Sequence, residues 1–393
     1  MRRITLITLA VAGIALLVGC TDSPPNTDAW LSYKYTSSCG QYFIDRRSGL
    51  PSGPCAPIID NTDSAYVYYL GLGVPDPNNY SFSDWLAGNG FPPDGNSSPY
   101  AIYGNLADLQ IGREMHCLQN GQKIACFVSN FGTIGGDMTA NVEQPFTDFP
   151  PFGRVAMVYD PTINGPNQVS FYAFGTKFGP DLDQAGNPVE HDDALLYDIA
   201  LDGEGKKTVP RMCMACHGGT YDTGSDTATG AKFLPFDLFS FRFPTDTGYS
   251  FDDQQENLRK LNALVLATNP GQGITDLING MYPNGVNNTG SIPVDGYVPA
   301  GWSNLSTLYT GVVRPYCRTC HLAQPEQFTS ADDWAELGPL LNTMICQKHD
   351  MPHSQVSFGL TGTKYGFWND RVAQQDMGNF FKELGINSCL PSD

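Results

Sequence analysis

Basic side chains are scarce in this sequence. The 393 residues include 22 Lys and Arg against 40 Asp and Glu, so the formal net charge is −18 at pH 7. Nucleic acid and anionic lipid head groups would both be repelled by such a surface, which excludes them as electrostatic partners. A soluble protein partner is instead expected to present a basic patch.

Charged residues of either sign are also few, at 16%, and no repeat of fixed period appears. Gly (42) and Pro (29) are abundant. This composition favours many turns with short regular elements between them over a long helical bundle. The chain is nevertheless long enough for two or three domains, and its 41% hydrophobic and 12% aromatic residues can build substantial cores.

The apolar run at the N-terminus is too short to span a bilayer comfortably. Arg2 and Arg3 precede apolar residues 4–18, and Gly19 and Cys20 end the run, as in a secretory signal. Residues 1–20 resemble a bacterial lipoprotein signal, in which Cys20 is lipidated and becomes the mature N-terminus. Thr21 favours the outer membrane in that resemblance. The alternative is an ordinary signal peptide with an incidental cysteine.

Two C-x-x-C-H motifs carry the chemistry of the chain. In this motif the two thiols add across the vinyl groups of a haem, and the adjacent histidine becomes the proximal iron ligand. The adjoining histidine and the presence of a second copy disfavour a redox dithiol or half of a zinc site. We therefore expect two covalently bound haem c groups, held by Cys213, Cys216 and His217 and by Cys317, Cys320 and His321.

Six of the eleven cysteines remain after Cys20 and the haem motifs: Cys39, Cys55, Cys117, Cys126, Cys346 and Cys389. An even number in an exported protein suggests three disulfides. Proximity favours 39 with 55, 117 with 126 and 346 with 389, although six cysteines allow fifteen pairings. A hairpin that turns at Gly121-Gln122 would place Cys117 opposite Cys126, whereas a turn at Asn120-Gly121 would offset them by two.

The chain is expected to fold as α+β, with a β-rich N-terminal domain and mainly helical haem regions after it. Residues 21–60 look like a tether. Within 61–200, the segments 124–128, 155–159 and 169–174 are rich in β-branched and aromatic residues and are bounded by turn residues, so they predict an antiparallel β-rich domain.

The periodicity becomes helical after residue 200. Ser250 and Asp253 form a capping-box signature before an apolar stripe that Pro270-Gly271 ends. A second stripe, 305–312, leads straight into the second motif, and a third, 373–384, ends at Gly385. We expect a first haem region over 201–299, where Gly218 and Gly219 would admit close approach to the haem. Residues 300–393 resemble a cytochrome c-like domain.

The sixth iron ligand decides what each haem can do, because methionine raises the potential and an open position admits oxygen or peroxide. For the second haem, Met351 in a Met-Pro loop is favoured, with His353 as the main rival and His349 also nearby. Met377 lies on an apolar helical stripe and is expected to pack in the core.

The first haem has no persuasive ligand downstream of its motif. Upstream, Met115 and His116 lie beside Cys117, and on a strand they would face opposite ways, so at most one can reach the iron. Met115 is favoured over His116, and His191, Met281 or no ligand stay open. Arg113 would either pair with a haem propionate or lie solvated at the surface.

These motifs together resemble a group of bacterial two-haem cytochrome lipoproteins whose role is poorly defined. The resemblance covers most of residues 100–390 and rests on Gly-Arg-Glu-Met-His-Cys at 112–117, Ala-Cys-Phe-Val at 125–128, Cys-His-Gly-Gly at 216–219 and Phe-Leu-Pro-Phe-Asp at 233–237. It implies a periplasmic or surface-facing protein that is lipid-anchored in the bacterial envelope.

Three functions fit these observations. The first is electron transfer between envelope partners through two six-coordinate haems. The second is a peroxidase- or oxygenase-like enzyme with one open iron, for which residues 190–193, Glu-His-Asp-Asp, are a titratable cluster that otherwise reads as a charged turn. The third is a subunit of a respiratory complex or surface conduit, where docking to a partner is the main task.

Overall fold

The computed structural model describes residues 62–133, 136–146, 150–163, 168–182, 188–199, 207–222, 224–324, 328–348 and 366–393. The signal segment, the tether, Cys20, the Cys39–Cys55 pair and the loop with His349, Met351 and His353 lie outside these residues. Across the described ranges no helix is both long and apolar enough to cross a membrane.

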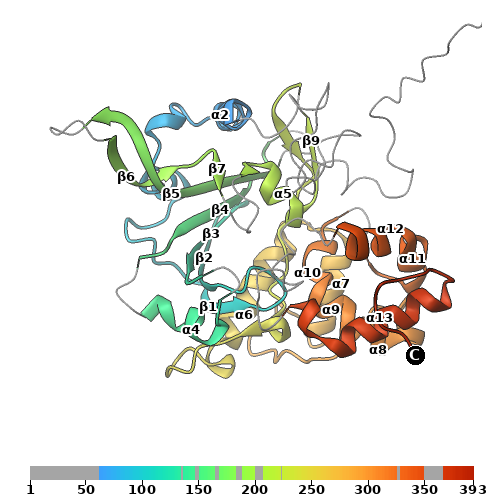
Figure 1. The fold of residues 1–393 in the computed structure, drawn as a ribbon. Coiled ribbons are helices and arrows are strands. Elements are labelled where there is room, and N and C mark those ends of the chain that lie inside the picture. The colour runs from blue at the N-terminus through green and yellow to red at the C-terminus, as the bar shows by residue number, and fades with distance from the viewer. Residues whose placement is uncertain are drawn as a thin grey trace, which may run out of the picture.

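A seven-stranded antiparallel sheet forms the N-terminal part of the fold (Figure 1). Its order is β11-β1-β2-β3-β4-β5-β6, so six strands follow the chain and β11 returns from beyond the first motif to pair with β1. The strands are β1 (Tyr100–Asn105), β2 (Gly112–Asn120), β3 (Lys123–Phe131), β4 (Gly153–Tyr159), β5 (Val169–Leu182), β6 (Pro188–Leu195) and β11 (Phe241–Arg242).

The three strands predicted from sequence are confirmed as parts of β3, β4 and β5. Two small antiparallel ladders flank the sheet: β7 (Asp198–Ile199) with β8 (Lys207–Thr208), and β9 (Thr220–Asp222) with β10 (Thr227–Thr229). Together with the helices they make the class α+β, as expected.

The β2–β3 hairpin has the predicted register. Cys117 lies opposite Cys126 and Asn120 lies opposite Lys123, so the turn falls at Gly121-Gln122, with Gly121 at φ +62°. The two facing cysteines form a disulfide, and their Cα atoms are 4.1 Å apart. This bond staples the middle of the sheet.

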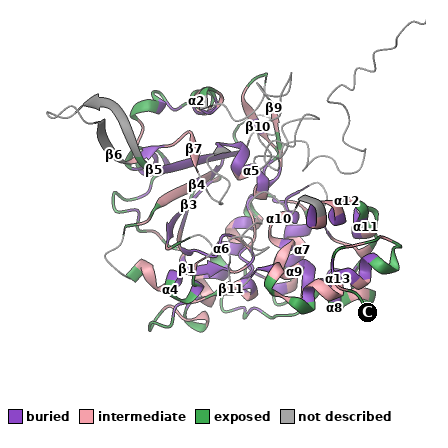
Figure 2. Cartoon of the chain, in the orientation of Figure 1, coloured by how far each residue is buried: buried purple, intermediate pink, exposed green. Residues whose placement is uncertain are grey.

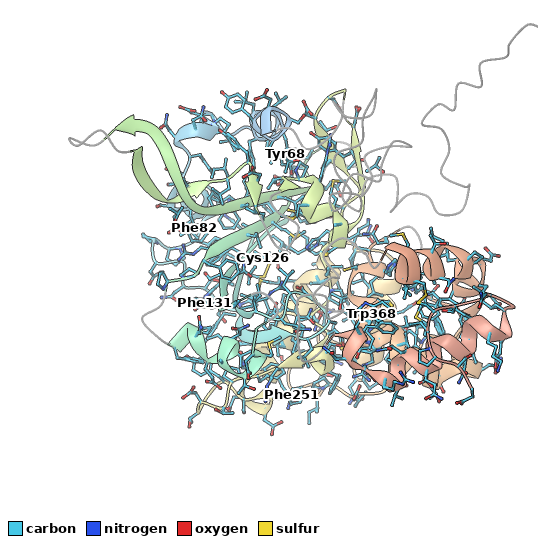
Figure 3. The ribbon with its side chains drawn as sticks, in the orientation of Figure 1. Tyr68, Phe82, Cys126, Phe131, Phe251 and Trp368 are labelled. Carbon is cyan, nitrogen blue, oxygen red and sulfur yellow. A yellow bond between two sulfur atoms is a disulfide. The ribbon has the colours of Figure 1, made fainter. Side chains whose placement is uncertain are left out.

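Helices also occur in the segment for which only strands were expected. They are α2 (Thr62–Gly71), η3 (Pro77–Asn79), α3 (Phe82–Asn89), α4 (Met138–Glu143) and η4 (Gln144–Phe146). Ser81 and Asp84 form a capping box that starts α3. Fully buried Trp85 on this helix then packs edge-on against Phe127 of the sheet. Phe82, labelled in Figure 3, lies beside both rings. The apolar side chains of α3 therefore stabilise it as a helix by packing on the apolar face of the sheet.

Four helical elements follow β8 in the chain, two of them before β11 and two after it: α5 (Arg211–His217), η5 (Leu238–Ser240), α6 (Phe251–Ala267) and α7 (Gln272–Met281). Helix α6 begins as predicted, because the Ser250 hydroxyl accepts from the Asp253 amide and the Asp253 carboxylate accepts from the Ser250 amide. It ends just before Pro270-Gly271. The capping box thus fixes the start of α6 through local hydrogen bonds.

The C-terminal part is helical (Figure 1). The predicted stripe before the second motif lies on one continuous helical run, because α8, η7 and α9 follow one another without a gap over 306–316, and η7 within it is a π-helical turn. Likewise, α13 carries the predicted stripe, and Gly385 has φ +71°. The elements are η6 (Ser303–Leu305), α8 (Ser306–Leu308), η7 (Tyr309–Val313), α9 (Arg314–Tyr316), α10 (Arg318–His321), α11 (Ala331–Glu336), α12 (Gly338–Thr343), η8 (Met344–Lys348), η9 (Phe367–Asn369) and α13 (Arg371–Glu383).

Two hydrophobic cores organise these parts (Figure 2). The larger core fills the space around the sheet and also includes Leu322 and Ala323, which follow the second motif. The smaller core lies among the C-terminal helices and contains Trp302, Trp334 and, as predicted, Met377. The second motif is therefore located where the two cores meet.

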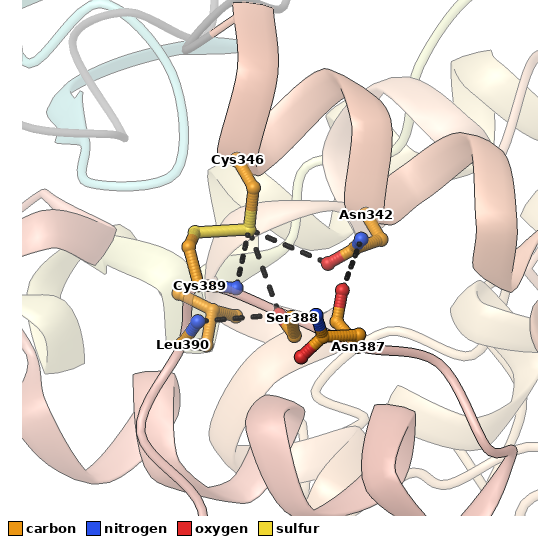
Figure 4. The surroundings of a disulfide bond; sticks show 6 residues. All are labelled: Asn342, Cys346, Asn387, Ser388, Cys389 and Leu390. Atoms are coloured by element: carbon orange, nitrogen blue, oxygen red, sulfur yellow. Dashed lines mark hydrogen bonds between the residues drawn. A yellow bond between two sulfur atoms is a disulfide. The ribbon is translucent and has the colours of Figure 1, made fainter.

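The predicted disulfide between Cys346 and Cys389 closes the C-terminal part (Figure 4). It links η8 to the tail beyond α13, across 43 residues of chain. The Asn342 side-chain amide donates to the Asn387 carbonyl at 3.1 Å beside it. The bond therefore ties the middle of the smaller core's sequence to its C-terminal end.

Candidate functional site

One cavity separates the sheet from the two motif helices. Its empty space, including the part open to solvent, is about 1490 Å³. On the sheet side, Arg113 and Met115 of β2 and Val155 and Met157 of β4 line it, each pair two residues apart on one strand face. The opposite side holds all six predicted haem-binding residues: Cys213, Cys216, His217, Cys317, Cys320 and His321.

Helix α5 presents the first motif. Cys213 and Cys216 are three residues apart and lie on one helix face. Nδ1 of His217 is 2.8 Å from the Lys232 carbonyl oxygen. Because a carbonyl only accepts hydrogen bonds, Nδ1 carries the proton and Nε2 keeps its lone pair. In this tautomer, a backbone carbonyl that accepts from Nδ1 orients the imidazole so that Nε2 can bind a metal.

Burial reinforces that state of His217. It lowers the pKa of the imidazole to about 4, although the hydrogen bond to Lys232 acts in the opposite direction. The ring is therefore neutral at neutral pH and is available as a ligand. Phe171 of β5 lies against it, with the ring centroids 5.5 Å apart.

The second motif occupies α10. His321 is 2% exposed, and its ring stacks on Phe328 with the centroids 3.7 Å apart and the planes 12° apart. Burial raises the pKa of the Cys317 thiol, and it raises that of Cys213 to about 12. Thiols in this state are poor nucleophiles, which argues against a redox dithiol in the folded chain.

The two motifs are packed directly against each other. The Sγ atoms of Cys216 and Cys320 are 3.3 Å apart, although 104 residues separate them in sequence. The Gln324 side-chain amide donates to the Ala215 carbonyl at 2.8 Å and to the Met214 carbonyl at 3.3 Å. A side chain just after the second motif is thereby hydrogen-bonded to the backbone of helix α5.

The two glycines after the first motif are required by protein packing. Gly218 has φ +66°, and a Cβ added there would lie 2.0 Å from the Ala323 carbonyl oxygen. Gly219 has φ +92° and closely approaches the backbone of Thr229 and Ala231. Only glycine fits both demands at position 218.

Two ion pairs flank the motifs, one partly buried and one buried. Arg113, expected at the surface or on a propionate, pairs with Asp108 at 2.9 Å, and the side chains are 16% and 17% exposed. Arg318, inside the second motif, pairs with Asp237, and these side chains are 4% and 8% exposed. Sequence reasoning missed both aspartates, since neither lies in a motif that marks a charge partner.

Met115 and His116 face opposite sides of β2, as strand alternation predicts. Met115 lines the cavity. His116 is buried on the other face between Tyr100 and Phe127, with ring centroids 5.6 and 5.0 Å away, and its Nε2 is 3.2 Å from Glu114. Of these two candidates, only Met115 is on the side of the motifs.

The other candidates lie elsewhere. Met281 is 1% exposed in the larger core, away from the residues that line the cavity. His191 belongs to β6, and its side chain is outside what the structure describes. In the nearby cluster, Asp193 pairs with Arg154. Met157, which sequence reasoning did not single out, lines the cavity from β4, opposite Cys126 in register.

Among the described residues, no three His, Cys, Asp or Glu side chains are grouped as a metal site. Comparisons with protein-family models, curated proteins and solved structures found no match for the chain. The functional argument therefore rests on the motifs and on the cavity that they share.

Proposed function

We propose that this protein is a two-haem c-type cytochrome that transfers electrons in the bacterial cell envelope. One haem c would be attached to Cys213 and Cys216, and the other to Cys317 and Cys320. The observation that carries the proposal is the meeting of the two C-x-x-C-H motifs in one cavity, with Cys216 and Cys320 3.3 Å apart at Sγ. Electron carriers gain from such proximity because each iron can exchange electrons with the other.

The residues of the cavity fit the group. His217 holds its Nε2 lone pair available through the hydrogen bond from Nδ1 to Lys232. Aromatic and aliphatic side chains make the walls, among them Phe171, Val155 and Phe236, and such walls favour a flat apolar ring system over water. When bound, a haem supplies an iron that carries one electron by alternating between ferric and ferrous states.

The chain would set the chemistry of the irons through its axial ligands. His217 and His321 are the proposed proximal ligands. For the first haem, Met115 on the sheet face is the proposed distal ligand, because His116 is turned away. A thioether ligand would raise the reduction potential. For the second haem the proposed ligand stays Met351, with His353 as the alternative.

The proposed location rests on the lipoprotein-like motif at Cys20, and the proposed partners rest on the net charge of the protein. A lipid at Cys20 would anchor the protein in the outer membrane. The net charge of −18 would draw a basic redox partner into weak, salt-sensitive encounters. The fold itself would then have two tasks: to exclude water from the cavity and to hold the two haems close together.

Counting haems in cysteine variants tests the proposal. The full chain would be produced with a c-type maturation system, and haem would be measured by pyridine haemochrome and intact mass. We expect two haems in the native chain, one each in C213A/C216A and C317A/C320A, and two in the control C346A/C389A, which also lacks two cysteines. A native chain without covalent haem overturns the proposal.

A further inference from the structure

Each motif has an arginine–aspartate pair beside it, partly buried at the first motif and buried at the second, and the two pairs come from different parts of the fold. Arg113 and Asp108 belong to β2 and to the loop before it, and both line the cavity. Arg318 lies between Cys317 and Cys320, and Asp237 is contributed by the segment before η5. Charged side chains at such depth are rare unless they are paired.

The first pair lies close to the first motif. Arg113 Nη2 is 2.9 Å from Asp108. His217 interacts electrostatically with both members of the pair, and Arg113 also interacts with Cys216. The Arg113 guanidinium is cationic at neutral pH, and Asp108 is its charge partner.

The second pair is sealed more deeply. Arg318 Nε donates to Asp237 Oδ2 at 3.1 Å, and a second donor from the same guanidinium reaches that oxygen. Ser240 donates to the same oxygen at 2.8 Å, and Arg318 also contacts the Tyr309 hydroxyl at 3.4 Å. Asp237 Oδ1 is buried without a hydrogen-bond partner. The hydrogen bonds from Arg318 and Ser240 to the Asp237 carboxylate therefore all converge on Oδ2.

Charge balance explains why such pairs matter beside an iron. Removing one member of a buried pair leaves the other charge uncompensated. An uncompensated cation disfavours the ferric state, which carries one more positive charge than the ferrous state. Neutralising the aspartate alone should therefore raise the potential of the nearer haem, whereas neutralising both members should largely cancel that change.

We propose that Asp108–Arg113 and Asp237–Arg318 are positioning pairs that separately set the reduction potentials of the first and the second haem. This inference rests on the proposed function. It goes beyond that function by assigning a separate electrostatic control to each of two irons that share one cavity.

Spectropotentiometric titration of D108N and D237N tests the pairs. In the C317A/C320A background, which keeps the first haem, D108N should favour reduction about tenfold, equal to about 59 mV for one electron, and D237N should act less. In C213A/C216A, which keeps the second haem, the order should reverse. The double variants R113Q/D108N and R318Q/D237N should return toward the parent value. E256Q, which breaks the Glu256–Arg259 pair outside the cavity, is the matched control.

The outcomes separate the two proposals. If single-haem chains do not fold, the same substitutions in the full chain should each move one component of a two-component titration. Equal shifts at both haems, no shift at either, or a shift that persists in the double variants overturns the assignment while the two-haem count stands. A chain without covalent haem overturns this inference together with the proposed function.

Discussion

The two motifs share a cavity but are supported in different ways. The first lies on α5 against a seven-stranded sheet that the Cys117–Cys126 bond staples. The second lies on α10 among short helices that the Cys346–Cys389 bond closes. The contrast shows that each C-x-x-C-H motif is encoded within five residues, whereas the opposite wall of the cavity is assembled from distant strands and loops.

Replacing the cavity-facing methionine should have the largest effect on the first site. We expect M115A to remove the distal ligand, so that one of the two haems becomes high-spin in optical and EPR spectra. H116A, on the opposite face of the same strand, should keep the native spectra. If M157A changes the spin state and M115A does not, the ligand comes from β4 and the assignment of Met115 is wrong.

Breaking the deeper ion pair should cost more stability than breaking the shallower one. D237N leaves Arg318 buried without its charge partner, which we expect to lower the free energy of unfolding by about 3–5 kcal/mol. D108N should cost less, because Arg113 and Asp108 line the cavity and are more exposed. Urea unfolding measures both, and a larger loss in D108N would contradict the ranking.

The two disulfides should stabilise their regions unequally. The cysteines are 43 residues apart in the C-terminal bond and 9 apart in the hairpin. Loop-closure entropy then predicts losses of about 4 kcal/mol for C346A/C389A and about 2.7 kcal/mol for C117A/C126A. Thermal or urea unfolding of the two variants compares them. Equal losses would mean that strain or residual structure outweighs loop length.

A smaller effect is expected where the motifs touch. G218A adds a Cβ against the Ala323 carbonyl at a positive φ, so we expect a loss of about 1–3 kcal/mol. The control is G121A, which also has a positive φ but has nothing within 4 Å of an added Cβ. The difference between the two variants reports the contact between the motifs, and no difference would argue against that contact.

Local signals explain what the sequence could predict of the fold. The capping box at Ser250 fixed the start of α6, and the turn at Gly121-Gln122, one of the two that the sequence allowed, placed Cys117 opposite Cys126. Helix α2 was missed because its Tyr-Val-Tyr-Tyr run has strand propensity. It is helical because tertiary contacts decide: Tyr68 accepts from the Phe171 amide, and Tyr69 donates to the Leu196 carbonyl.

The candidate site likewise has parts that the sequence could predict and parts that it could not. Both C-x-x-C-H motifs could be recognised in the sequence because the chemistry proposed for them needs contiguous residues. The meeting of Cys216 with Cys320, the role of Gly218 and the partners Asp108 and Asp237 depend on contacts across many residues of chain. No local pattern marks such contacts, since charge partners and close backbone approaches are set by the packing of whole elements.

EPR of the fully oxidised protein tests the shared cavity most directly. If the two haems lie side by side, the two ferric irons should interact magnetically. The spectrum of the native chain should then differ from the sum of the spectra of C213A/C216A and C317A/C320A. A native spectrum equal to that sum, from protein that carries two haems, would contradict the account.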